Sequence, residues 1–504
     1  MVIFPTKKHL KVLFVSSEAA PYAQAGGLGQ VMYSLPKALR EIGVDARIFI
    51  PKYGNIDAQK KYNLKTIYQH LEVPTGDEKT PSLICNVKFF QPQNEKEAPV
   101  YFLENMEYYE KRANIYGYSD DSIRFGLLSR GVLEFLEKNS DWLPDVLNCL
   151  DWQTGYCVNF FKTKYQNSQK LKNLIVVFSI HNLHHQGTFD HRLVSELDFD
   201  DGKSEIPSFF SERFPKINAM KRGIIYSDAI NTVSETYSRE ILTPEYGEGL
   251  DKLLLEVKEK LFGILNGIDY DFWNPKTDKL IYKNYTSLSI YKKKDNKIAL
   301  QKEFNLPLKK NIPVVSMVSR LDEQKGIDLV LETIDHLLKE MSFQFILVGG
   351  GSERYTKPLL ELKERYPKKI GVFLLPNFTL PHLVFAGSDI ILCPSRFEPC
   401  GVTHLQAMKY GTVPLVRKTG GLADTVENFN PTSGSGYGFV FENYDRWCFF
   451  KEMVRALENF KYKKTWEGLQ KRVMELDFSW KESAKKYLQL YKKAFEIKRV
   501  KREK

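Results

Sequence analysis

Arg320 and Lys325 are two cations placed where they could act on a phosphate. They lie five residues apart, directly after the apolar run Val314–Val318. Two cations held at the end of a strand could bind a diphosphate and stabilise the negative charge that develops as it leaves. An isolated pair of this kind also occurs as ordinary surface charge, so its interpretation depends on the motifs around it.

A second loop combines a carboxylate with the start of a predicted helix. Glu398 follows the apolar run Ile390–Cys393 in the segment PSRFEPCGVT, and the residues Gly401–Thr403 lead into the helix. Backbone amides at a helix start could bind a phosphate while Glu398 holds sugar hydroxyls. Cys400 is an alternative as a nucleophile, but the sequence shows no histidine partner that would activate its thiol.

Glycine-rich turns follow strand-like runs in both halves of the chain. The first is AQAGGLGQ, before a helix expected from about Leu28 to Ile42, and the second is Val348–Ser352 after FQFILV. Glycines between a strand and a helix let backbone N–H groups approach a phosphate or a sugar. The spacing is not G-x-G-x-x-G, so a nicotinamide cofactor is not indicated, and a purely structural turn is the alternative for each.

A histidine cluster lies in IHNLHHQGTFDH, which contains His181, His184, His185 and His191. The segment has no H-E-x-x-H motif, and no acidic or cysteine ligand lies at helix spacing among the histidines, so a zinc site is not favoured. We interpret the cluster as one catalytic or substrate-binding histidine among ordinary loop residues.

The composition narrows the class of protein. The chain has 504 residues, 43% hydrophobic and 27% charged, which is typical of a globular protein and excludes a disordered or fibrous one. The net charge is 73 − 62 = +11, but the basic clusters are scattered and lack a nucleic-acid-binding motif, so we expect no nucleic-acid partner. Few cysteines, no apolar run near the ~18 residues of a membrane helix and no signal peptide predict a cytoplasmic protein without a membrane partner.

Short apolar runs alternate with longer amphipathic stretches along the whole chain. This alternation predicts parallel sheets covered by helices, and two sets of runs predict two doubly wound Rossmann-like α/β domains. The runs are Lys11–Ser16, Ala46–Pro51, Pro99–Leu103, Val146–Cys149, Leu174–Ile180 and Ala229–Val233, then Val314–Val318, Phe343–Val348, Val372–Leu375, Ile390–Cys393, Val413–Val416 and Gly438–Phe441.

Turn-rich NGIDYDFWNPKTD and lysine-rich YKKKDNK mark the boundary between the two predicted domains. We predict an N-terminal domain over residues 1–270, a linker or hinge over 271–310 and a second domain over 311–480. A helical stretch and a basic tail follow over 481–504.

Motifs along nearly the whole chain resemble those of bacterial glycogen synthases and plant starch synthases, which are retaining transferases of glycosyltransferase family 5. They include VLFVSSEAAPYAQAGGLGQV, IHNLHHQGTFD, VSRLDEQKGIDLV and PSRFEPCGVTHLQAMKYGTVPLVRKTGGLADTV, in the family's order. The resemblance implies the GT-B fold, in which two Rossmann-like domains face each other across a deep cleft and the C-terminal helix crosses back to the first domain.

The resemblance also implies an activity. It implies transfer of glucose, with retention, from ADP-glucose or UDP-glucose to the non-reducing 4-OH of an α-1,4-glucan. ADP-glucose is the family default, and neither a metal nor another cofactor is expected.

The resemblance assigns roles to single residues. Arg320 and Lys325 match the cationic pair that binds the donor diphosphate, and Glu398 matches the carboxylate at the transferred glucose. His181 matches the catalytic histidine near the sugar's primary hydroxyl, and Asp151 matches a polar group lining the glucose site. Further positions are assigned to the donor site, namely Gln24, Gly26, Gly27, Asn266, Ser395, Cys400, Gly401, Val402, Thr403 and Gln406. Tyr116 or Tyr118 is expected to bring an aromatic ring near the acceptor or the donor.

Four departures from the family pattern concern these sites. Gln24 stands where the family usually has a lysine, and losing one charge-assisted contact would cost about 1.5–3 kcal/mol. Gln406 stands where related transferases often have a second glutamate that binds the ribose. The segment 148–153 keeps its aspartate and tryptophan but has lost three histidines. In the region of the base-stacking tyrosine, Pro376–Thr379, the aromatic residue is displaced.

Two alternatives and one mechanistic choice stay open at this stage. The chain could be a related retaining transferase with another donor or acceptor, or a non-catalytic glucan-binding paralogue. The presence of Arg320, Lys325, His181 and Glu398 argues against the paralogue. Retention could arise by front-face attack or through a covalent glucosyl-enzyme on Glu398.

Overall fold

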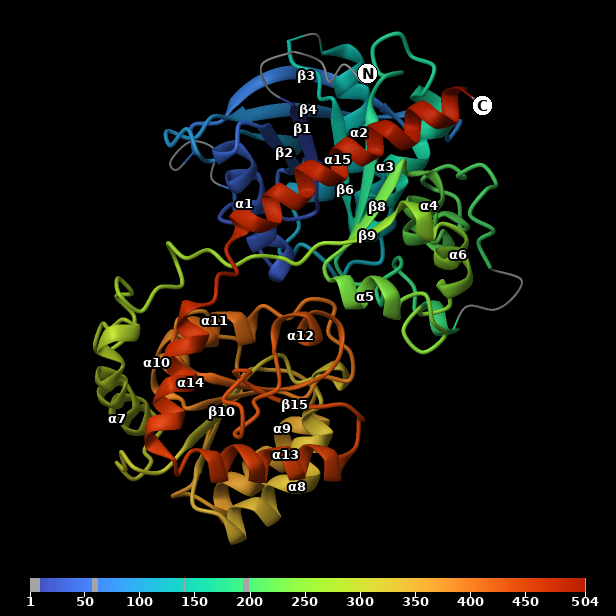
Figure 1. The fold of residues 1–504 in the computed structure, drawn as a ribbon. Coiled ribbons are helices and arrows are strands. Elements are labelled where there is room, and N and C mark those ends of the chain that lie inside the picture. The colour runs from blue at the N-terminus through green and yellow to red at the C-terminus, as the bar shows by residue number, and fades with distance from the viewer. Residues whose placement is uncertain (1–9, 57–61, 140, 194–198, 504) are drawn as a thin grey trace. The chain divides into compact units, whose positions relative to one another are not determined.

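The computed structural model describes residues 10–56, 62–139, 141–193 and 199–503, and its contacts divide the chain into two units (Figure 1). The first unit takes in the chain up to Val233, then Ser238–Asn266 and the segment from Trp480 onward. The second unit takes in Ser234–Tyr237 and Gly267–Ser479. Each unit is built around one sheet.

The first unit has nine strands in the order β3-β4-β5-β2-β1-β6-β7-β8-β9. Neighbouring strands are parallel except in the pairs β3–β4 and β4–β5. The strand order reverses between β1 and β6, which is the switch point where doubly wound sheets bind ligands. The strands are β1 (Lys11–Val15), β2 (Asp45–Pro51), β3 (Lys65–Pro74), β4 (Ser82–Phe90), β5 (Val100–Glu104), β6 (Val146–Leu150), β7 (Ile175–Ile180), β8 (Ala229–Thr232) and β9 (Leu261–Gly263).

Helices cover the sheet of the first unit, as expected for strands whose side chains are buried on both faces. Pro36 lies inside the first of these helices, and its neighbours Leu35 and Leu39 are buried. The helices are α1 (Gly27–Glu41), α2 (Asp121–Lys138), α3 (Asp151–Phe160), α4 (Ala219–Tyr226), α5 (Glu235–Glu240), α6 (Asp251–Glu256) and α15 (Trp480–Glu503). The short α5 begins in the segment assigned to the second unit.

The second unit has six parallel strands in the order β12-β11-β10-β13-β14-β15, with its switch point between β10 and β13. The strands are β10 (Val314–Val318), β11 (Gln344–Val348), β12 (Ile370–Phe373), β13 (Ile390–Cys393), β14 (Val413–Arg417) and β15 (Phe439–Phe441). The helices are α7 (Lys293–Glu303), α8 (Ile327–Glu340), α9 (Glu353–Arg365), α10 (Leu380–Gly387), α11 (Thr403–Lys409), α12 (Gly420–Thr425), α13 (Arg446–Asn459) and α14 (Lys463–Glu475).

The two parallel sheets confirm the predicted doubly wound α/β class, and each predicted apolar run coincides with or overlaps an observed strand. The predicted run Val372–Leu375 lies two residues late, because β12 spans Ile370–Phe373. The antiparallel strands β3 and β4 were not predicted. Most residues of β3 are exposed or half-buried at the edge of the sheet, so the strand lacks the continuous apolar run that marks the others.

The segment 271–310, predicted as a linker, lies inside the second unit. The buried Lys293 ammonium donates to the carbonyl oxygens of Phe385 (2.8 Å) and Tyr410 (2.9 Å). The carboxylate of Asp278 accepts from His382 (2.7 Å) and from the Tyr410 hydroxyl (2.5 Å). The lysine-rich sequence of this segment suggested a solvated linker. In the structure, Lys293 instead donates to buried carbonyl oxygens and attaches the segment to the second unit.

The C-terminal helix α15 packs in the first unit through a polar stripe. The Tyr491 hydroxyl donates to Asn148 Oδ1 (3.0 Å), and the Tyr487 hydroxyl accepts from Asn231 Nδ2 (3.0 Å). Ser179 joins the two asparagines with bonds of 2.7 Å to each. All five residues are buried, so the network specifies how α15 lies on β6, β7 and β8.

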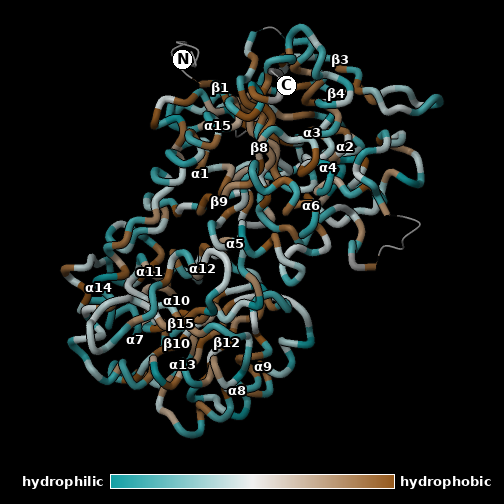
Figure 2. Tube along the Cα trace, turned by 45° about the vertical axis from the view of Figure 1, so that its right-hand side comes forward, coloured by the Kyte–Doolittle hydropathy of each residue, from teal (hydrophilic) through white to brown (hydrophobic). Residues whose placement is uncertain are grey.

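Hydrophobic residues concentrate along the central strands and hydrophilic ones along the surrounding loops (Figure 2). Among the described residues, no helix is both long enough and apolar enough to cross a bilayer.

Candidate active site

Each unit gathers its candidate residues around its own switch point. In the first unit, the glycine-rich turn follows β1, Asp151 follows β6 and His181 follows β7. In the second unit, Arg320 and Lys325 follow β10, and Glu398 follows β13. Carboxyl ends of parallel strands meet at one edge of a sheet, so both sets lie where doubly wound proteins bind ligands.

Glu18 organises the glycine-rich turn of the first unit, and the sequence analysis missed it. Its buried Oε2 accepts the N–H groups of Ala25 (2.7 Å) and Gly26 (3.0 Å). Its Oε1 accepts the Tyr116 hydroxyl (2.9 Å), which also bonds Ser17 Oγ (2.7 Å). In this structure the Gly26 N–H therefore bonds the protein's own carboxylate, and the assignment of Gly26 to the donor site stays a prediction.

The exposed part of this turn runs from Gln24 to Gly27. Gln24 donates only weakly to the Gly26 carbonyl, at 3.3 Å. A Cβ at Gly27 would meet no atom within 4 Å, so space remains open beside it. Of the two candidate tyrosines, Tyr116 bonds Glu18, whereas the Tyr118 hydroxyl accepts the Asn114 N–H at 3.0 Å. Glu18 could not be predicted as the residue that organises this turn, because a single glutamate before a glycine-rich turn matches no known motif.

Asp151 and His181 are brought together by the ends of β6 and β7. Asp151 begins α3 with a left-handed backbone (φ +55), and its Oδ1 accepts the N–H groups of His181 (2.7 Å) and Asn182 (3.4 Å). Burial raises the pKa of Asp151 to about 7, and the charge of Glu18 adds to this effect against the two amide bonds. Asp151 can therefore hold or release a proton near neutral pH.

His181 is a neutral imidazole at neutral pH. Burial lowers the pKa of His181 to about 4, so the ring can exchange hydrogen bonds but carries no charge. Its Nε2 and the Oδ1 of Asn266 are buried and have no partner among the described residues. Each such atom costs about 1–3 kcal/mol unless something bonds it, which favours a ligand for both.

Lys325 and Glu398 form a close ion pair in the second unit. Lys325 Nζ lies 2.6 Å from Glu398 Oε2, which also accepts Ser395 Oγ at 3.0 Å. Gly326 makes this approach possible, because its backbone is left-handed (φ +70) and a Cβ there would lie 2.1 Å from the Pro394 carbonyl oxygen. The loops after β10 and β13 are therefore packed backbone to backbone.

Arg320 is not part of that pair. Its side chain is 65% exposed, contacts Asp322 at 3.1 Å and bonds Gln324 at 3.4 Å. The structure thus joins Lys325 to Glu398 and leaves Arg320 at the surface of the same loop.

The glycines of the TGGLADTV motif hold the loop that carries Glu398. A Cβ at Gly420 would lie 1.9 Å from the Glu398 carbonyl oxygen, and one at Gly421 would lie 1.9 Å from that of Cys400. The Gly421 N–H donates to the Glu398 carbonyl at 3.1 Å. The motif is a backbone support for the EPCG turn, a role that the sequence alone did not suggest.

The residues after Glu398 present free amides. Gly401 is left-handed (φ +73), Val402 precedes α11 and Thr403 begins it. Within the described ranges, the N–H groups of these three residues have no hydrogen-bond acceptor. Cys400 and Gln406 are buried beside them. Such N–H groups can donate hydrogen bonds to an anion, and their role at the donor phosphate stays a prediction.

The remaining predicted feature is the histidine cluster. His184 and His191 both bond the carboxylate of Glu248, at 2.9 and 3.0 Å, so they are separated in role from His181. In the part of the chain that the structure describes, no group of three or more His, Cys, Asp or Glu side chains is arranged to hold a metal.

Two doubly wound parallel sheets, each with charged and polar side chains at its switch point, are the architecture of GT-B glycosyltransferases. Residues 11–256 match the model of the starch synthase catalytic domain, and residues 299–468 match that of glycosyl transferases group 1. The chain belongs to the glycogen synthase and starch synthase family and is a hexosyltransferase, which confirms the resemblance.

Known relatives match nearly end to end. The chain is 41% identical to a glycogen synthase of Clostridium acetobutylicum, over 96% of this chain and 99% of the relative. It is 42% identical to a glycogen synthase of Clostridium perfringens, over 96% of this chain and 98% of the relative. The catalytic domain of starch synthase IV from Arabidopsis thaliana, solved with ADP and acarbose, has a TM-score of 0.83 at 30% identity and covers 97% of this chain and 100% of that one.

Proposed function

We propose that this synthase transfers glucose, with retention, from ADP-glucose in preference to UDP-glucose to the non-reducing 4-OH of an α-1,4-glucan. The family membership and the ADP and acarbose bound to the Arabidopsis relative support this choice of donor and acceptor. The observation that carries the proposal is the 2.6 Å pair of Lys325 and Glu398, one cation and one carboxylate at a switch point.

The second unit binds the donor diphosphate in this proposal. Lys325 and Arg320 neutralise the charge that grows on the leaving nucleotide diphosphate, and the amides of Gly401–Thr403 hold its distal phosphate. Glu398 keeps Lys325 oriented before the donor arrives. Ser395 fixes the Glu398 carboxylate through its 3.0 Å bond.

The transfer breaks the bond between the anomeric carbon and the diphosphate oxygen and forms the bond from that carbon to O4 of the acceptor. The proton of the acceptor hydroxyl ends on the released diphosphate. Glu398 orients or attacks the glucosyl group, and neutral His181 bonds its primary hydroxyl. Both routes to retention fit these residues, and trapping a glucosyl-Glu398 ester would select the covalent one.

The first unit contributes the remaining polar groups. Asp151 and Asn266 bind the glucose, and Gln24 and Gly27 contact the donor. Cys400 and Gln406 stand behind the donor loop of the second unit. Because Gln24 carries no charge, the cations of the proposed diphosphate site come from Arg320 and Lys325.

The proposal uses no metal and no cofactor, because two cations and three amides supply the charge stabilisation. Activity should therefore persist in a chelator. We also propose a cytoplasmic protein with neither a nucleic-acid nor a membrane partner.

The test is nucleotide release from ADP-glucose and UDP-glucose, each with and without glycogen, with Glu398→Ala as the control. We expect release that depends on glycogen, is faster with ADP-glucose and vanishes in the variant. Release from neither donor by a folded protein that binds glycogen would contradict the proposal. It would favour another donor or a glucan-binding paralogue.

A further inference from the structure

A short segment of the second unit lies between two stretches of chain that belong to the first. This segment, Ser234–Tyr237, is named the crossing segment below. Only Val233 separates it from the end of β8, and α5 begins within it. Its partner in the second unit is Asp424, which lies in α12 within the TGGLADTV motif.

Three donors of the crossing segment converge on the Asp424 carboxylate. The Ser234 hydroxyl donates to Oδ2 and the Thr236 hydroxyl donates to Oδ1, both at 2.6 Å. The Thr236 N–H also donates, at 3.1 Å to Oδ2 and 3.2 Å to Oδ1. Hydroxyl bonds of this length to a carboxylate are charge-assisted and roughly twice as strong as neutral ones. Asp424 therefore attaches the crossing segment to α12.

The crossing segment itself has a defined conformation. The buried Ser234 Oγ accepts the Tyr237 N–H at 2.8 Å while its proton goes to Asp424. Ser234 thus caps α5, and Asp424 adds a negative charge at the start of the same helix, where the helix dipole favours it. The Tyr237 ring is buried as well. The bonds to Asp424 therefore hold an ordered piece of backbone.

α12, which carries Asp424, is also bonded to the turn that carries Glu398. The Gly421 N–H donates to the Glu398 carbonyl at 3.1 Å. The Thr425 hydroxyl donates to the Gly421 carbonyl at 2.5 Å. Because its proton is used there, Thr425 Oγ1 accepts from His404 Nε2 at 2.6 Å, and His404 lies in α11, the helix that follows the Glu398 turn. α12 therefore links the crossing segment to the Glu398 turn.

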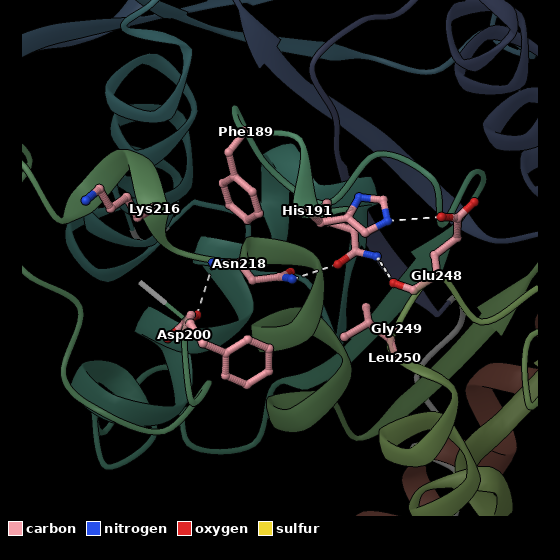
Figure 3. Close-up of a pocket in the computed structure, with 10 residues that line it drawn as sticks. Phe189, His191, Asp200, Lys216, Asn218, Glu248, Gly249 and Leu250 are labelled. Carbon is pink, nitrogen blue, oxygen red and sulfur yellow. Dashed lines mark hydrogen bonds and ion pairs between the residues drawn. The ribbon is translucent and has the colours of Figure 1, made fainter. Parts of the chain in front are cut away.

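Other carboxylates of the chain make bonds of the same kind. In the first unit, Glu248 accepts from His191 at 3.0 Å (Figure 3). In the second unit, Asp445 caps α13 by accepting two backbone N–H groups, at 2.9 and 3.1 Å. Asp424 differs in its position, because the helix that carries it also holds the Glu398 carbonyl. Asp445 therefore provides a control with the same chemistry in the same unit.

We propose that Asp424 is a positioning residue for Glu398. By attaching the crossing segment to α12, it fixes the helix that supports the Glu398 turn and keeps the Glu398 carboxylate oriented for transfer. Asp424 contacts no substrate and acts through Gly421 and the Glu398 backbone. The inference rests on the proposed function, because it takes Glu398 to act on the transferred glucose.

The test is Asp424→Ala in the full chain, with Asp445→Ala as the matched control. We expect the kcat of glycogen-dependent nucleotide release to fall about 10- to 100-fold in Asp424→Ala, as when a catalytic group is slightly misplaced. In Asp445→Ala, kcat should stay within about twofold of the parent. Calorimetric titration with ADP, or with UDP if UDP-glucose is the better donor, should give the parent's stoichiometry in both variants. A folding defect would lower the stoichiometry.

A double-mutant cycle tests whether the effect passes through the crossing segment. Thr236→Val removes one hydroxyl that donates to Asp424 and keeps the shape of the side chain. In the Thr236→Val background, Asp424→Ala should lower kcat less than in the parent, since part of the interaction is already absent. Equal losses in the two backgrounds would overturn the inference.

Hydrogen exchange gives a measurement that does not depend on turnover. Asp424→Ala should speed exchange of the Gly421 N–H, whereas Asp445→Ala should speed exchange only at the start of α13. If the parent transfers no glucose but this difference is seen, the proposed function fails and the support of the Glu398 turn by Asp424 stands. Unchanged exchange at Gly421, an unchanged kcat in Asp424→Ala, or a fall in kcat matched by a lower stoichiometry or by Asp445→Ala would overturn the inference.

Discussion

Lys325 Nζ lies 2.6 Å from Glu398 Oε2, although the two residues are 73 positions apart in the chain. The pair joins the loops that follow β10 and β13, the two strands that flank the switch point of the second unit. It places one cation and one carboxylate side by side, and the proposed function assigns the first to the diphosphate and the second to the transferred glucose.

Removing the cation should abolish most of the activity. In Lys325→Ala, the leaving diphosphate loses a charge and Glu398 loses its ion-pair partner, so we expect the rate of nucleotide release to fall at least about 100-fold. The matched control is Lys339→Ala, which breaks an exposed ion pair with Asp335 and should leave the rate unchanged. A Lys325→Ala rate within a few fold of the parent would remove Lys325 from the donor site.

Restoring the family's charge should strengthen donor binding. In Gln24→Lys we expect the KM for the nucleotide-glucose to fall about tenfold or more, since one charge-assisted contact contributes about 1.5–3 kcal/mol. Gln93→Lys adds the same charge at another exposed position and serves as the control. Steady-state kinetics with varied donor measures both. An unchanged KM would mean that nearby Glu18, rather than phosphate, neutralises the new lysine.

The approach of the two loops can be tested through Gly326. Gly326→Ala imposes a left-handed alanine, which costs about 1–2 kcal/mol, and its Cβ would also collide with the Pro394 carbonyl oxygen. The control is Gly434→Ala, where φ is +71 and nothing lies within 4 Å of the added Cβ. We expect Gly326→Ala to lower both the melting temperature and the rate more than Gly434→Ala. Equal effects in the two variants would mean that the loops tolerate separation.

The stability of the first unit should depend on the proton of Asp151. Its pKa of about 7 in the folded chain lies above the ordinary 3.8, mainly because of burial. The folded state therefore binds more protons over this range, and the stability that Asp151 contributes is complete at acid pH and is lost as the pH rises through about 7. Asp151→Asn cannot ionise and should lose less stability than the parent between about pH 5 and pH 8.

Thermal midpoints at several pH values check the Asp151 prediction. Asp141→Asn, at an exposed position of the same unit, is the control and should follow the parent. Parallel curves for the parent and Asp151→Asn would show that Asp151 is ionised in the folded chain across this range.

The hydroxyl groups of the buried tyrosines of α15 should contribute to the free energy of unfolding in addition to the burial of their rings. Tyr491→Phe leaves Asn148 Oδ1 without its donor and Tyr487→Phe leaves Asn231 Nδ2 without its acceptor, at about 1–3 kcal/mol each. Denaturant unfolding measures the loss, with the exposed Tyr462→Phe as the control. Because Ser179 links the two asparagines, the double variant should lose less than the sum of the single ones. Strict additivity would show two independent bonds.

The sequence predicted the strands that are buried on both faces, because each appears as an unbroken apolar run. It did not predict β3, whose exposed residues at a sheet edge leave no such run. Among site residues, the loops that carry Lys325 and Glu398 were found. Their pairing was not, since it depends on strand order and on the close approach allowed by Gly326. Glu18 was missed because its role arises only when the turn folds back onto it.

The position of α15 has a consequence for how the protein is made. The first unit needs Tyr487 and Tyr491 to complete the network over β6, β7 and β8, yet the ribosome synthesises them after the whole of Gly267–Ser479. Until then, Asn148 Oδ1 and Asn231 Nδ2 in the nascent first unit lack their tyrosine partners, and the face that α15 covers stays open while the second unit emerges. During that interval the exposed face is a natural substrate for chaperones, and translation speed through the second unit sets how long it stays open.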